Sequence, residues 1–297
     1  MSVQMDGIAT AVGRSSTHFD AIVTGAGFGG LRMLHELREL GVSVQVIEAG
    51  SDVGGTWYWN RYPGCRTDSE AWYYSYSFSK EIIEEWTWSE RFPAQGEMER
   101  YLQFVADRLD LRKDIRFNVS MSSAVYNGAD NVWTLTLENG EELTCTYFIT
   151  AQGILSSMYK PPFPGIESFE GETYWTARWP DDRGVDFTGQ RVAIIGTGAT
   201  GVQAIPVIAQ TAKQVAVFQR TATYVLPSRN HALDEAQTVA IRRDNVEMWQ
   251  KTERHPLGMP YAPAAGRVAA DVSAEEQQSI LEAAWELGTF RFFGLFS

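Results

Sequence analysis

The chain has 297 residues, enough for two or three domains, and its 44% hydrophobic and 21% charged residues exclude a disordered protein. Its net charge of −12 disfavours nucleic acid and anionic membranes as partners, because both repel an acidic surface. No apolar run reaches the length of a membrane span, and four scattered histidines form no metal-binding pattern. The two cysteines indicate reduced thiols, so we predict a cytoplasmic protein without a metal.

The N-terminal part of the sequence predicts a strand–helix–strand unit. After a tail over residues 1–17, a short buried strand at 21–24 leads into a glycine loop at 25–30. A helix is predicted over 31–40 and a second strand over 43–48. The helix should bury the apolar face formed by Met33, Leu34, Leu37 and Leu40.

The next hundred residues change character. Residues 54–78 are rich in glycine and aromatic residues and predict a loop, and residues 95–111 predict a helix. Alternating apolar residues on both sides of Asn139-Gly140 predict a hairpin between residues 131 and 150. Prolines between Gly153 and Gly165 then indicate a domain boundary.

The pattern of strand, glycine loop and helix occurs a second time. A buried strand is predicted at 191–195, before the glycine loop at 196–201 and a helix that Pro206 should kink. A further strand is predicted at 214–219, and helices follow from about residue 231. Ser273 and Glu276 predict a capping box at the start of one of them.

The first glycine loop predicts an FAD site. Gly25, Gly27 and Gly30, with Phe28 between them, permit a tight turn and let backbone N–H groups approach a pyrophosphate at a helix N-terminus. Glu48 ends the following strand, 23 positions after Gly25. A carboxylate there can accept a hydrogen bond from a ribose hydroxyl, as FAD and NAD sites require.

The second glycine loop predicts an NADP site. Gly196, Gly198 and Gly201 have the same spacing, but the position 23 residues after Gly196 is the uncharged Gln219, followed by Arg220. A carboxylate would repel a ribose 2′-phosphate, whereas an arginine binds it. The alternative, in which both sets of glycines serve packing alone, leaves this contrast between acid and base unexplained.

Two different nucleotide sites indicate electron transfer from NADPH to a flavin and then to an acceptor. A disulfide reductase needs a close cysteine pair, but Cys65 and Cys145 are 80 positions apart. The sequence therefore favours oxygen or another small acceptor.

Residues 54–68 match a long motif of known enzymes at every fixed position. The motif reads Ala/Gly-Gly-x-Trp, four residues, Phe/Tyr-Pro-Gly/Met, three residues, Asp, and here it runs from Gly54 to Asp68. It is a fingerprint of the Baeyer–Villiger monooxygenases, which this sequence resembles from about residue 19 onward. In a second fingerprint of that family, Phe169, Gly171 and Trp179-Pro180 match, but Trp175 stands at the histidine position. Trp175 would either fill a core position at the domain junction or help to position a cofactor.

The resemblance implies an α/β fold with two Rossmann-like domains that bind FAD and NADP, followed by a helical segment. It also implies that NADPH and FAD are used to insert one atom of molecular oxygen next to a ketone carbonyl, giving an ester or lactone. It further implies that Asp68 is the catalytic residue; the alternative is an N-cap or a surface carboxylate. The resemblance further implies cofactor contacts for Thr56, Trp57, Arg66, Thr67, Asp68, Tyr74, Met121, Thr197, Gly198, Ala199, Thr200, Gly201, Val202, Gln203, Arg220 and Thr221.

Within this group, Thr56 would contact FAD through its backbone, Trp57 and Tyr74 would line the flavin, and Met121 would lie near the adenine. Residues 66–68 would lie where flavin and nicotinamide meet, residues 197–203 would cradle the NADP pyrophosphate, and Arg220 with Thr221 would hold the 2′-phosphate.

The family comparison also predicts that the chain is the N-terminal part of an enzyme. We expect an FAD-binding domain at 18–155, an NADP-binding domain at 156–228 and an incomplete helical segment at 229–297, with each sheet lacking later strands. The alternatives are half of a split enzyme completed by a second chain, and a non-catalytic nucleotide-binding module. A flavin N-hydroxylating monooxygenase is the other enzyme class that we consider.

Overall fold

The computed structural model describes residues 17–155, 157–180, 184–254, 268–292 and 295–296. It divides into two compact units, the first formed by Met1–Gly55 with Leu109–Ile154 and the second by Thr56–Arg108 with Leu155–Ser297. The domain ranges expected from the sequence stay predictions.

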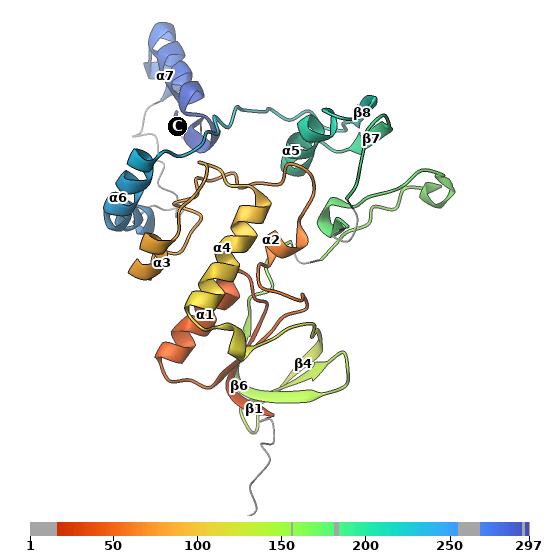
Figure 1. The fold of residues 1–297 in the computed structure, drawn as a ribbon, viewed down its shortest axis with the longest axis vertical. Helices are drawn as coiled ribbons and strands as arrows, with labels where there is room; N and C mark the ends of the chain where they lie inside the picture. Colours follow the sequence, from red (N-terminus) through yellow and green to blue (C-terminus); the bar gives the residue numbers. More distant parts are fainter. Residues whose placement is uncertain (1–16, 156, 181–183, 255–267, 293–294, 297) are drawn as a thin grey trace, which may run out of the picture. The chain divides into compact units, whose positions relative to one another are not determined.

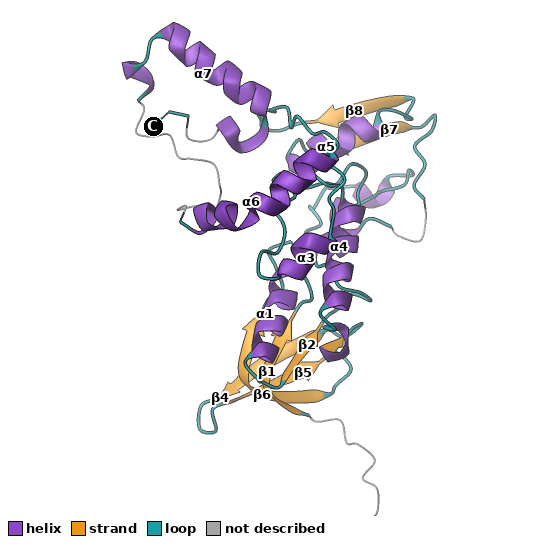
Figure 2. Cartoon of the chain, turned by 60° about the vertical axis from the view of Figure 1, so that its left-hand side comes forward, coloured by secondary structure: helices purple, strands orange, loops and turns teal. Residues whose placement is uncertain are grey.

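The first unit contains a six-stranded sheet with the strand order β3-β2-β1-β6-β5-β4. β1 pairs in parallel with both β2 and β6, and α1 connects β1 to β2 beside the sheet (Figures 1 and 2). This is the predicted strand–helix–strand unit. The elements are β1 (His18–Thr24), α1 (Phe28–Glu39), β2 (Val44–Ile47), the 3₁₀ turn η1 (Arg112–Asp114), β3 (Ile115–Arg116), β4 (Met121–Asn127), β5 (Val132–Leu137) and β6 (Glu142–Thr150).

The predicted hairpin is confirmed and supplies much of the core of this unit. β5 and β6 are antiparallel, and Leu135 lies opposite Leu143 in their register. The core cluster consists of Ile22, Ile47, Leu135, Leu137, Leu143 and Cys145. β4 was not predicted, because most of its side chains are exposed and the strand therefore has no apolar alternation.

The buried face of α1 differs from the prediction. The buried residues are Gly30, Leu31 and Leu34, whereas Leu40 is 76% exposed. Leu40 is the C-cap residue, beyond the last helical turn, and a glycine with φ of +73° follows it at position 41. The chain has therefore left the helical path before Leu40 could face the sheet.

The second unit contains the remaining helices and a two-stranded parallel sheet of β7 and β8. Its elements are α2 (Thr56–Trp59), α3 (Lys80–Glu85), α4 (Gln95–Arg108), η2 (Ile166–Ser168), η3 (Thr176–Arg178), β7 (Arg191–Ile195), α5 (Ala199–Ile208), β8 (Gln214–Phe218), α6 (Glu235–Glu253), η4 (Ala269–Asp271), α7 (Ala274–Leu287) and η5 (Thr289–Phe292).

β7 is not the buried strand that its apolar sequence predicts. Its residues alternate between exposed and half-buried, and Ile195 is 63% exposed. On β8, Phe218 is 58% exposed. Within the described residues, β7 and β8 pair only with each other. A parallel sheet is buried when helices cover both of its faces, and the single helix α5 is too small a cover, so apolar side chains of these strands stay exposed.

Side-chain caps define the starts of the C-terminal helices. The Ser273 side chain accepts a hydrogen bond from the backbone N–H of Glu276 at the start of α7, which confirms half of the predicted capping box. A complete capping box, formed by Asp234 and Gln237, begins α6. Both caps pair N–H groups that a helix start leaves without partners.

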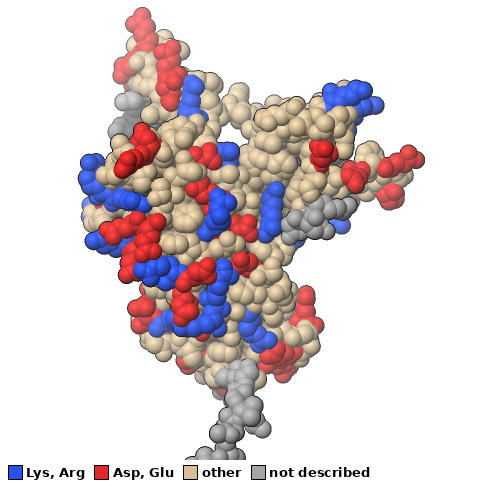
Figure 3. Space-filling model, in the orientation of Figure 1, with Lys and Arg blue, Asp and Glu red and all other residues tan. Residues whose placement is uncertain are grey.

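The charges on the face shown in Figure 3 are mixed. Basic and acidic side chains lie side by side over much of this face. Among the ion pairs of the described residues, Arg108 pairs with both Glu81 and Glu85. No helix among the described residues is long and apolar enough to cross a membrane.

A buried ion pair lies in the second unit. Arg91 Nη2 lies 2.8 Å from Glu70 Oε1, and Glu70 is fully buried. Arg91 also donates to the carbonyl oxygen of Leu287, so the pair connects two distant parts of the chain. Two charges removed from water depend on each other for compensation.

We therefore predict that Glu70→Gln destabilises the protein, because the substitution leaves the Arg91 charge buried without a counter-charge. The free energy of unfolding should fall by about 3 kcal/mol, measured by urea denaturation. The matched control is Glu84→Gln, which removes an exposed ion pair with Lys80 and should cost less than about 1 kcal/mol. Equal effects of the two substitutions would contradict the prediction.

Candidate functional site

The first glycine loop has the tight geometry that its sequence predicts. Gly25 has a φ of +100°, and a Cβ there would come within 2.6 Å of the Ala151 carbonyl oxygen. A Cβ on Gly30 would overlap the Gly25 carbonyl oxygen. Gly27 is the N-cap of α1 and provides no side-chain cap. The N–H groups at the start of α1, from Phe28 onward, are therefore presented to a ligand by a loop that excludes larger residues.

Glu48 holds this loop in place. Its side chain is only 4% exposed, and it accepts hydrogen bonds from the backbone N–H of Ala26 at 2.6 Å and of Gly50 at 2.7 Å. One carboxylate thus fixes the glycine loop and the chain after β2 together. Each carboxylate oxygen retains a further lone pair that a ribose hydroxyl could use.

Met121 lies in the same unit as the first loop. It begins β4, opposite Leu137 on β5, and packs against the core cluster as a partly buried side chain. Its predicted place near an adenine stays a prediction.

The second glycine loop repeats this geometry in the second unit. Gly196 has a φ of +106°, and a Cβ on Gly201 would overlap the Gly196 carbonyl oxygen. Gly198 is the N-cap of α5, without a side-chain cap, and a Cβ built on it would meet no described atom within 4 Å. The N–H groups of Ala199 and Thr200 stand in the first turn of a ten-residue helix, where they have no partner within the helix.

The residues that follow β8 have two environments: Gln219 contacts the glycine loop, whereas Arg220 and Thr221 face solvent. Gln219 Nε2 donates to Thr197 Oγ1 at 2.8 Å, so the uncharged residue at this position holds the glycine loop. Arg220 and Thr221 are exposed, and no described residue forms an ion pair or hydrogen bond with the Arg220 guanidinium. Arg220 is therefore available to an anionic ligand.

The aromatic residues of the first fingerprint lie in the second unit. Trp57 is 5% exposed and its ring meets that of Tyr74 edge to face, with centroids 5.6 Å apart. Burial raises the pKa of Tyr74, so its phenol stays neutral. Thr56 begins the short helix α2, and the Gln95 side chain donates to the Trp57 carbonyl oxygen.

Gln203 is the central residue of this site. From α5, its side-chain oxygen accepts hydrogen bonds from Tyr62 Oη at 2.9 Å and from the backbone N–H of Arg66 at 3.3 Å. Its side-chain nitrogen donates to the Arg66 carbonyl oxygen at 3.1 Å and to Asp68 Oδ1 at 3.3 Å. A Cβ on Gly64 would overlap the backbone oxygen of Gln203, so the fingerprint glycine permits this close approach. The amide thus joins the glycine-loop helix to the fingerprint.

The residues on either side of Asp68 are held by other groups. Arg66 Nη1 lies 3.2 Å from both Glu90 Oε2 and the Phe92 carbonyl oxygen. The Thr67 hydroxyl is buried and has no hydrogen-bond partner among the described residues. An orphaned hydroxyl of this kind fits a partner that a cofactor or water supplies.

The ionisable groups around Gln203 have shifted pKa values. Partial burial raises the pKa of the Asp68 carboxyl, and the hydrogen bond from Gln203 opposes this effect. Burial raises the pKa of the Cys65 thiol to about 11, so this thiol is not a nucleophile at neutral pH. Burial also raises the pKa of Tyr62, which keeps its hydroxyl a donor to Gln203.

Trp175, at the histidine position of the second fingerprint, is half-buried directly before η3. The ring packing nearby involves Tyr174 and Trp179, which both contact Phe187. The role of Trp175 stays a prediction.

The structure thus brings together some of the predicted residues. Asp68, Arg66 and Gln203 meet in the second unit, as do Thr197 and Gln219. Sequence reasoning assigned Gln203 to the pyrophosphate and did not find its bonds to the fingerprint. The only signal for this contact was Gly64, whose missing side chain marks a close backbone approach.

Comparison with known proteins assigns the family. Residues 19–255 match the model of the pyridine nucleotide-disulphide oxidoreductases, and the chain belongs to this family. The first glycine loop, the fingerprint and the second glycine loop all lie within the matched range.

The individual relatives are monooxygenases. The chain is 42% identical to "Phenazine N-monooxygenase PhzNO1" of Lysobacter antibioticus, over 96% of this chain and 53% of the relative. It is 44% identical to "Cyclohexanone 1,2-monooxygenase" of Acinetobacter sp, over 92% of this chain and 50% of the relative. A solved structure, "Oxidized steroid monooxygenase bound to NADP", matches with a TM-score of 0.90 and 44% identity, over 94% of this chain and 53% of that one. The resemblance to Baeyer–Villiger monooxygenases is confirmed, and the chain spans about half the length of the curated relatives it matches.

We predict that Glu48→Gln weakens flavin retention. In glutamine an NH₂ group replaces one of the two carboxylate oxygens that accept hydrogen bonds from the backbone N–H groups of Ala26 and Gly50. The measurement is the ratio of flavin to protein after gel filtration. Glu39→Gln, an exposed position on α1, is the control and should retain wild-type flavin content. Full flavin occupancy in Glu48→Gln would refute the assignment.

A second prediction concerns Gln203→Leu. Without the hydrogen bond that lowers it, the pKa of Asp68 should rise further, because burial alone then acts on the carboxyl. A step that needs the Asp68 carboxylate is lost as pH falls through this pKa, so the acid limb of the pH–rate profile should move to higher pH. Gln210→Leu, at an exposed position, is the control. An unchanged acid limb with normal stability would argue against a role for Gln203.

Proposed function

We propose that the protein containing this chain is an NADPH- and FAD-dependent Baeyer–Villiger monooxygenase. It would insert one atom of molecular oxygen next to a ketone carbonyl and release an ester or lactone. The observation that carries the proposal is the fingerprint from Gly54 to Asp68, whose carboxylate is hydrogen-bonded by Gln203 of the second glycine-loop helix. Relatives named for cyclohexanone and cyclopentanone oxygenation support it, as does a solved relative named as a complex with FAD and NADP.

The described residues fit both cofactors. For FAD, the start of α1 presents backbone N–H groups after its N-cap Gly27, and Glu48 follows β2 with acceptor capacity left for a ribose hydroxyl. For NADP, Gly198 leaves open space in front of α5, and Arg220 has no partner among the described residues. The cofactors would supply the redox chemistry: hydride transfer from NADPH and oxygen activation by the reduced flavin.

The chain's own residues would bind and orient these groups. Thr197 to Gln203 would hold the NADP pyrophosphate, and Arg220 with Thr221 the 2′-phosphate. In the FAD site, Phe28 would present its N–H to the pyrophosphate.

Trp57 and Tyr74 would line the flavin, with Thr56 contacting it through its backbone and Met121 near the adenine. Thr67 offers its unpaired hydroxyl. Arg66 would lie where flavin and nicotinamide meet, with its guanidinium bound to Glu90 and both of its backbone groups bound to Gln203.

Asp68 would have an electrostatic role. Its carboxylate, fixed by Gln203, can orient a neighbouring cation during oxygen transfer. Because burial raises the pKa of this carboxyl, the function is lost at a higher pH, as pH falls, than it would be for an exposed aspartate.

The test uses the whole protein with FAD, NADPH and a panel of cyclic and aryl ketones under ¹⁸O₂. An ester or lactone that carries one ¹⁸O atom is the expected product. Cofactor binding and NADPH oxidation without an oxygenated product would contradict the proposal.

N-oxygenation is the second candidate, because one relative is named for this reaction on a phenazine. The same assay with phenazines and amines separates the two functions, since an N-oxide then forms and no ester does. If neither product forms and both nucleotides bind, the chain is a nucleotide-binding module. If activity appears only with a second polypeptide, the enzyme is split. We also propose a cytoplasmic location, which the two free thiols support.

We predict that Arg220→Ala raises the KM for NADPH roughly ten- to a hundredfold and leaves that for NADH nearly unchanged, because a charge-assisted contact contributes about 1.5–3 kcal/mol. Initial rates with both nucleotides provide the measurement. The control is Arg243→Ala, at an exposed position on α6. Equal losses for the two nucleotides would rule out a 2′-phosphate contact.

A further inference from the structure

The fingerprint contains a buried tyrosine hydroxyl that has no place among the proposed cofactor contacts. Tyr62 is 9% exposed, and its Oη donates to Gln203 Oε1 at 2.9 Å. The side chains of Thr200 and Cys65 also lie next to this hydroxyl. Because a thiol accepts weakly and the Thr200 hydroxyl can itself donate, the single proton of Tyr62 is available to the amide of Gln203.

Hydrogen bonds occupy the whole side-chain amide of Gln203. Its oxygen accepts from Tyr62 Oη and from the backbone N–H of Arg66. Its nitrogen donates to the Arg66 carbonyl oxygen and to Asp68 Oδ1. An amide oxygen has two lone pairs and an amide nitrogen has two hydrogens, so no donor or acceptor of this side chain is left for a nucleotide. Although the resemblance assigns Gln203 to the NADP pyrophosphate, its amide holds the fingerprint.

The direction of this amide decides which group faces Asp68. In the structure the side-chain N–H of Gln203 donates to Asp68 Oδ1, which favours the ionised carboxylate. A reversed amide would present its oxygen there, and an amide oxygen repels a carboxylate because both groups only accept. Donors at the oxygen end hold the amide in the observed direction. The bond from Tyr62, at 2.9 Å, is shorter than the 3.3 Å bond from the Arg66 N–H.

We propose that Tyr62 is a positioning residue, which directs the Gln203 amide toward Asp68 through its hydroxyl. The proposal rests on the proposed function, because it concerns the carboxylate assigned to the monooxygenase reaction. Tyr62 takes part in no bond that forms or breaks. Its hydroxyl polarises the amide of Gln203, which strengthens the hydrogen bond that the amide nitrogen donates to Asp68.

The groups around Asp68 allow its titration to be followed. Burial raises the pKa values of three side chains on which the charge of Asp68 acts: Tyr62, Cys65 and Tyr74. All three are neutral at the acid pH where a carboxyl titrates. The charge of Arg66 is paired with Glu90 at 3.2 Å. A titration that follows aspartate alone therefore reports the carboxyl that Tyr62 and Gln203 should control.

The experiment measures the pKa of Asp68 in the whole protein by ¹³C NMR with labelled aspartate, which excludes the signal of Glu90. Asp68→Asn assigns the resonance. Tyr62→Phe should raise this pKa, because the Gln203 N–H then donates less strongly to the carboxylate. The acid limb of the pH–rate profile should move to higher pH with it. The dissociation constant for NADP should stay at the wild-type value.

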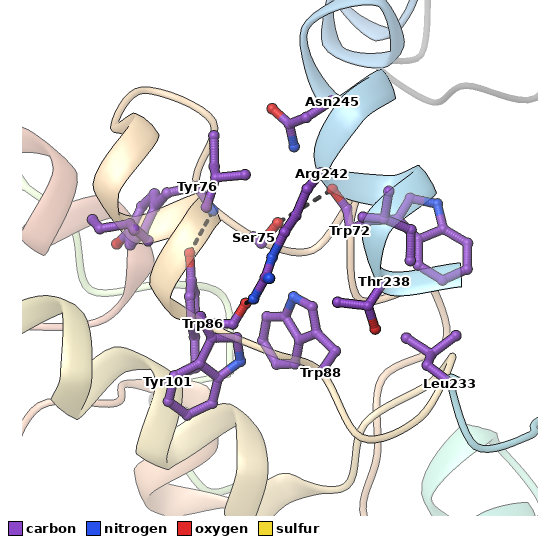
Figure 4. Close-up of a pocket in the computed structure, with 13 residues that line it drawn as sticks. Trp72, Ser75, Tyr76, Trp86, Trp88, Tyr101, Leu233, Thr238, Arg242 and Asn245 are labelled. Carbon is purple, nitrogen blue, oxygen red and sulfur yellow. Dashed lines mark hydrogen bonds between the residues drawn. The ribbon is translucent and has the colours of Figure 1, made fainter. Parts of the chain in front are cut away.

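Two further variants separate positioning from a loss of stability. In a Gln203→Leu background, Tyr62→Phe should cause no further shift, because the two residues act in series. The matched control is Tyr101→Phe. Tyr101 is 1% exposed, and its Oη accepts from the Tyr76 backbone N–H at 2.8 Å (Figure 4). This variant removes another buried hydroxyl of the same unit and should leave the titration of Asp68 unchanged.

Fluorotyrosine at position 62 should give an effect of the opposite sign. Fluorine makes the phenol a stronger donor, so the amide is polarised further and the pKa of Asp68 should fall below its wild-type value. This replacement keeps the hydroxyl, and it decides the question should Tyr62→Phe fail to fold.

The proposal is overturned if neither replacement at position 62 moves the pKa of Asp68, or if Tyr101→Phe moves it equally. It is also overturned if the shifts of Tyr62→Phe and Gln203→Leu add. Weaker NADP binding in Gln203→Leu with an unchanged titration of Asp68 would assign the amide to the nucleotide instead. Because the NMR titration needs no turnover, shifted titrations without an oxygenated product would refute only the proposed function. An oxygenated product with unshifted titrations would refute only the positioning role.

Discussion

The organisation of the second unit depends on the side-chain amide of Gln203. A side-chain amide donates and accepts in the same plane, and Gln203 uses both functions on a segment more than 130 positions earlier in the chain. Asp68 receives one of these bonds, so a residue of the glycine-loop helix sets the position of the proposed catalytic carboxylate. The interaction needs Gly64, since any side chain there would collide with the backbone of α5.

The two glycine loops have the same backbone geometry and differ in the residues that come after their second strands. In the first unit Glu48 is buried and serves two backbone N–H groups. In the second unit Gln219 performs a similar holding role through Thr197, and Arg220 stays exposed. Two loops of the same geometry are thus held differently, the first by a carboxylate and the second by an amide. The second arrangement leaves no negative charge to repel a 2′-phosphate.

In the fingerprint region, side chains supply backbone hydrogen bonds that helices and strands supply elsewhere. Residues 56–94 contain only short helices among their described elements, so many backbone groups lack a helix or strand partner. Glu97 accepts from the backbone N–H of Ser89, and Asn230 accepts from that of Phe92. The buried pair of Glu70 and Arg91 extends this network to Leu287. Polar residues here satisfy backbone groups that would otherwise be buried without partners.

The sequence by itself determined the local units: both glycine loops with their strands and helices, the Asn-Gly hairpin, and the family resemblance. The local units depend on turn chemistry and periodicity over a few residues, and the resemblance depends on the motif from Gly54 to Asp68; tertiary contacts did not override these signals in this chain. The sequence did not reveal β4, the exposed surface of β7, or the exposure of Leu40, because burial depends on what packs against an element. Gln203 was assigned to a ligand by its motif, yet its bonds to Tyr62, Arg66 and Asp68 emerged only in the folded chain. Such long-range hydrogen bonds leave no periodic trace in the sequence, since each partner is fixed by the path of the chain between them.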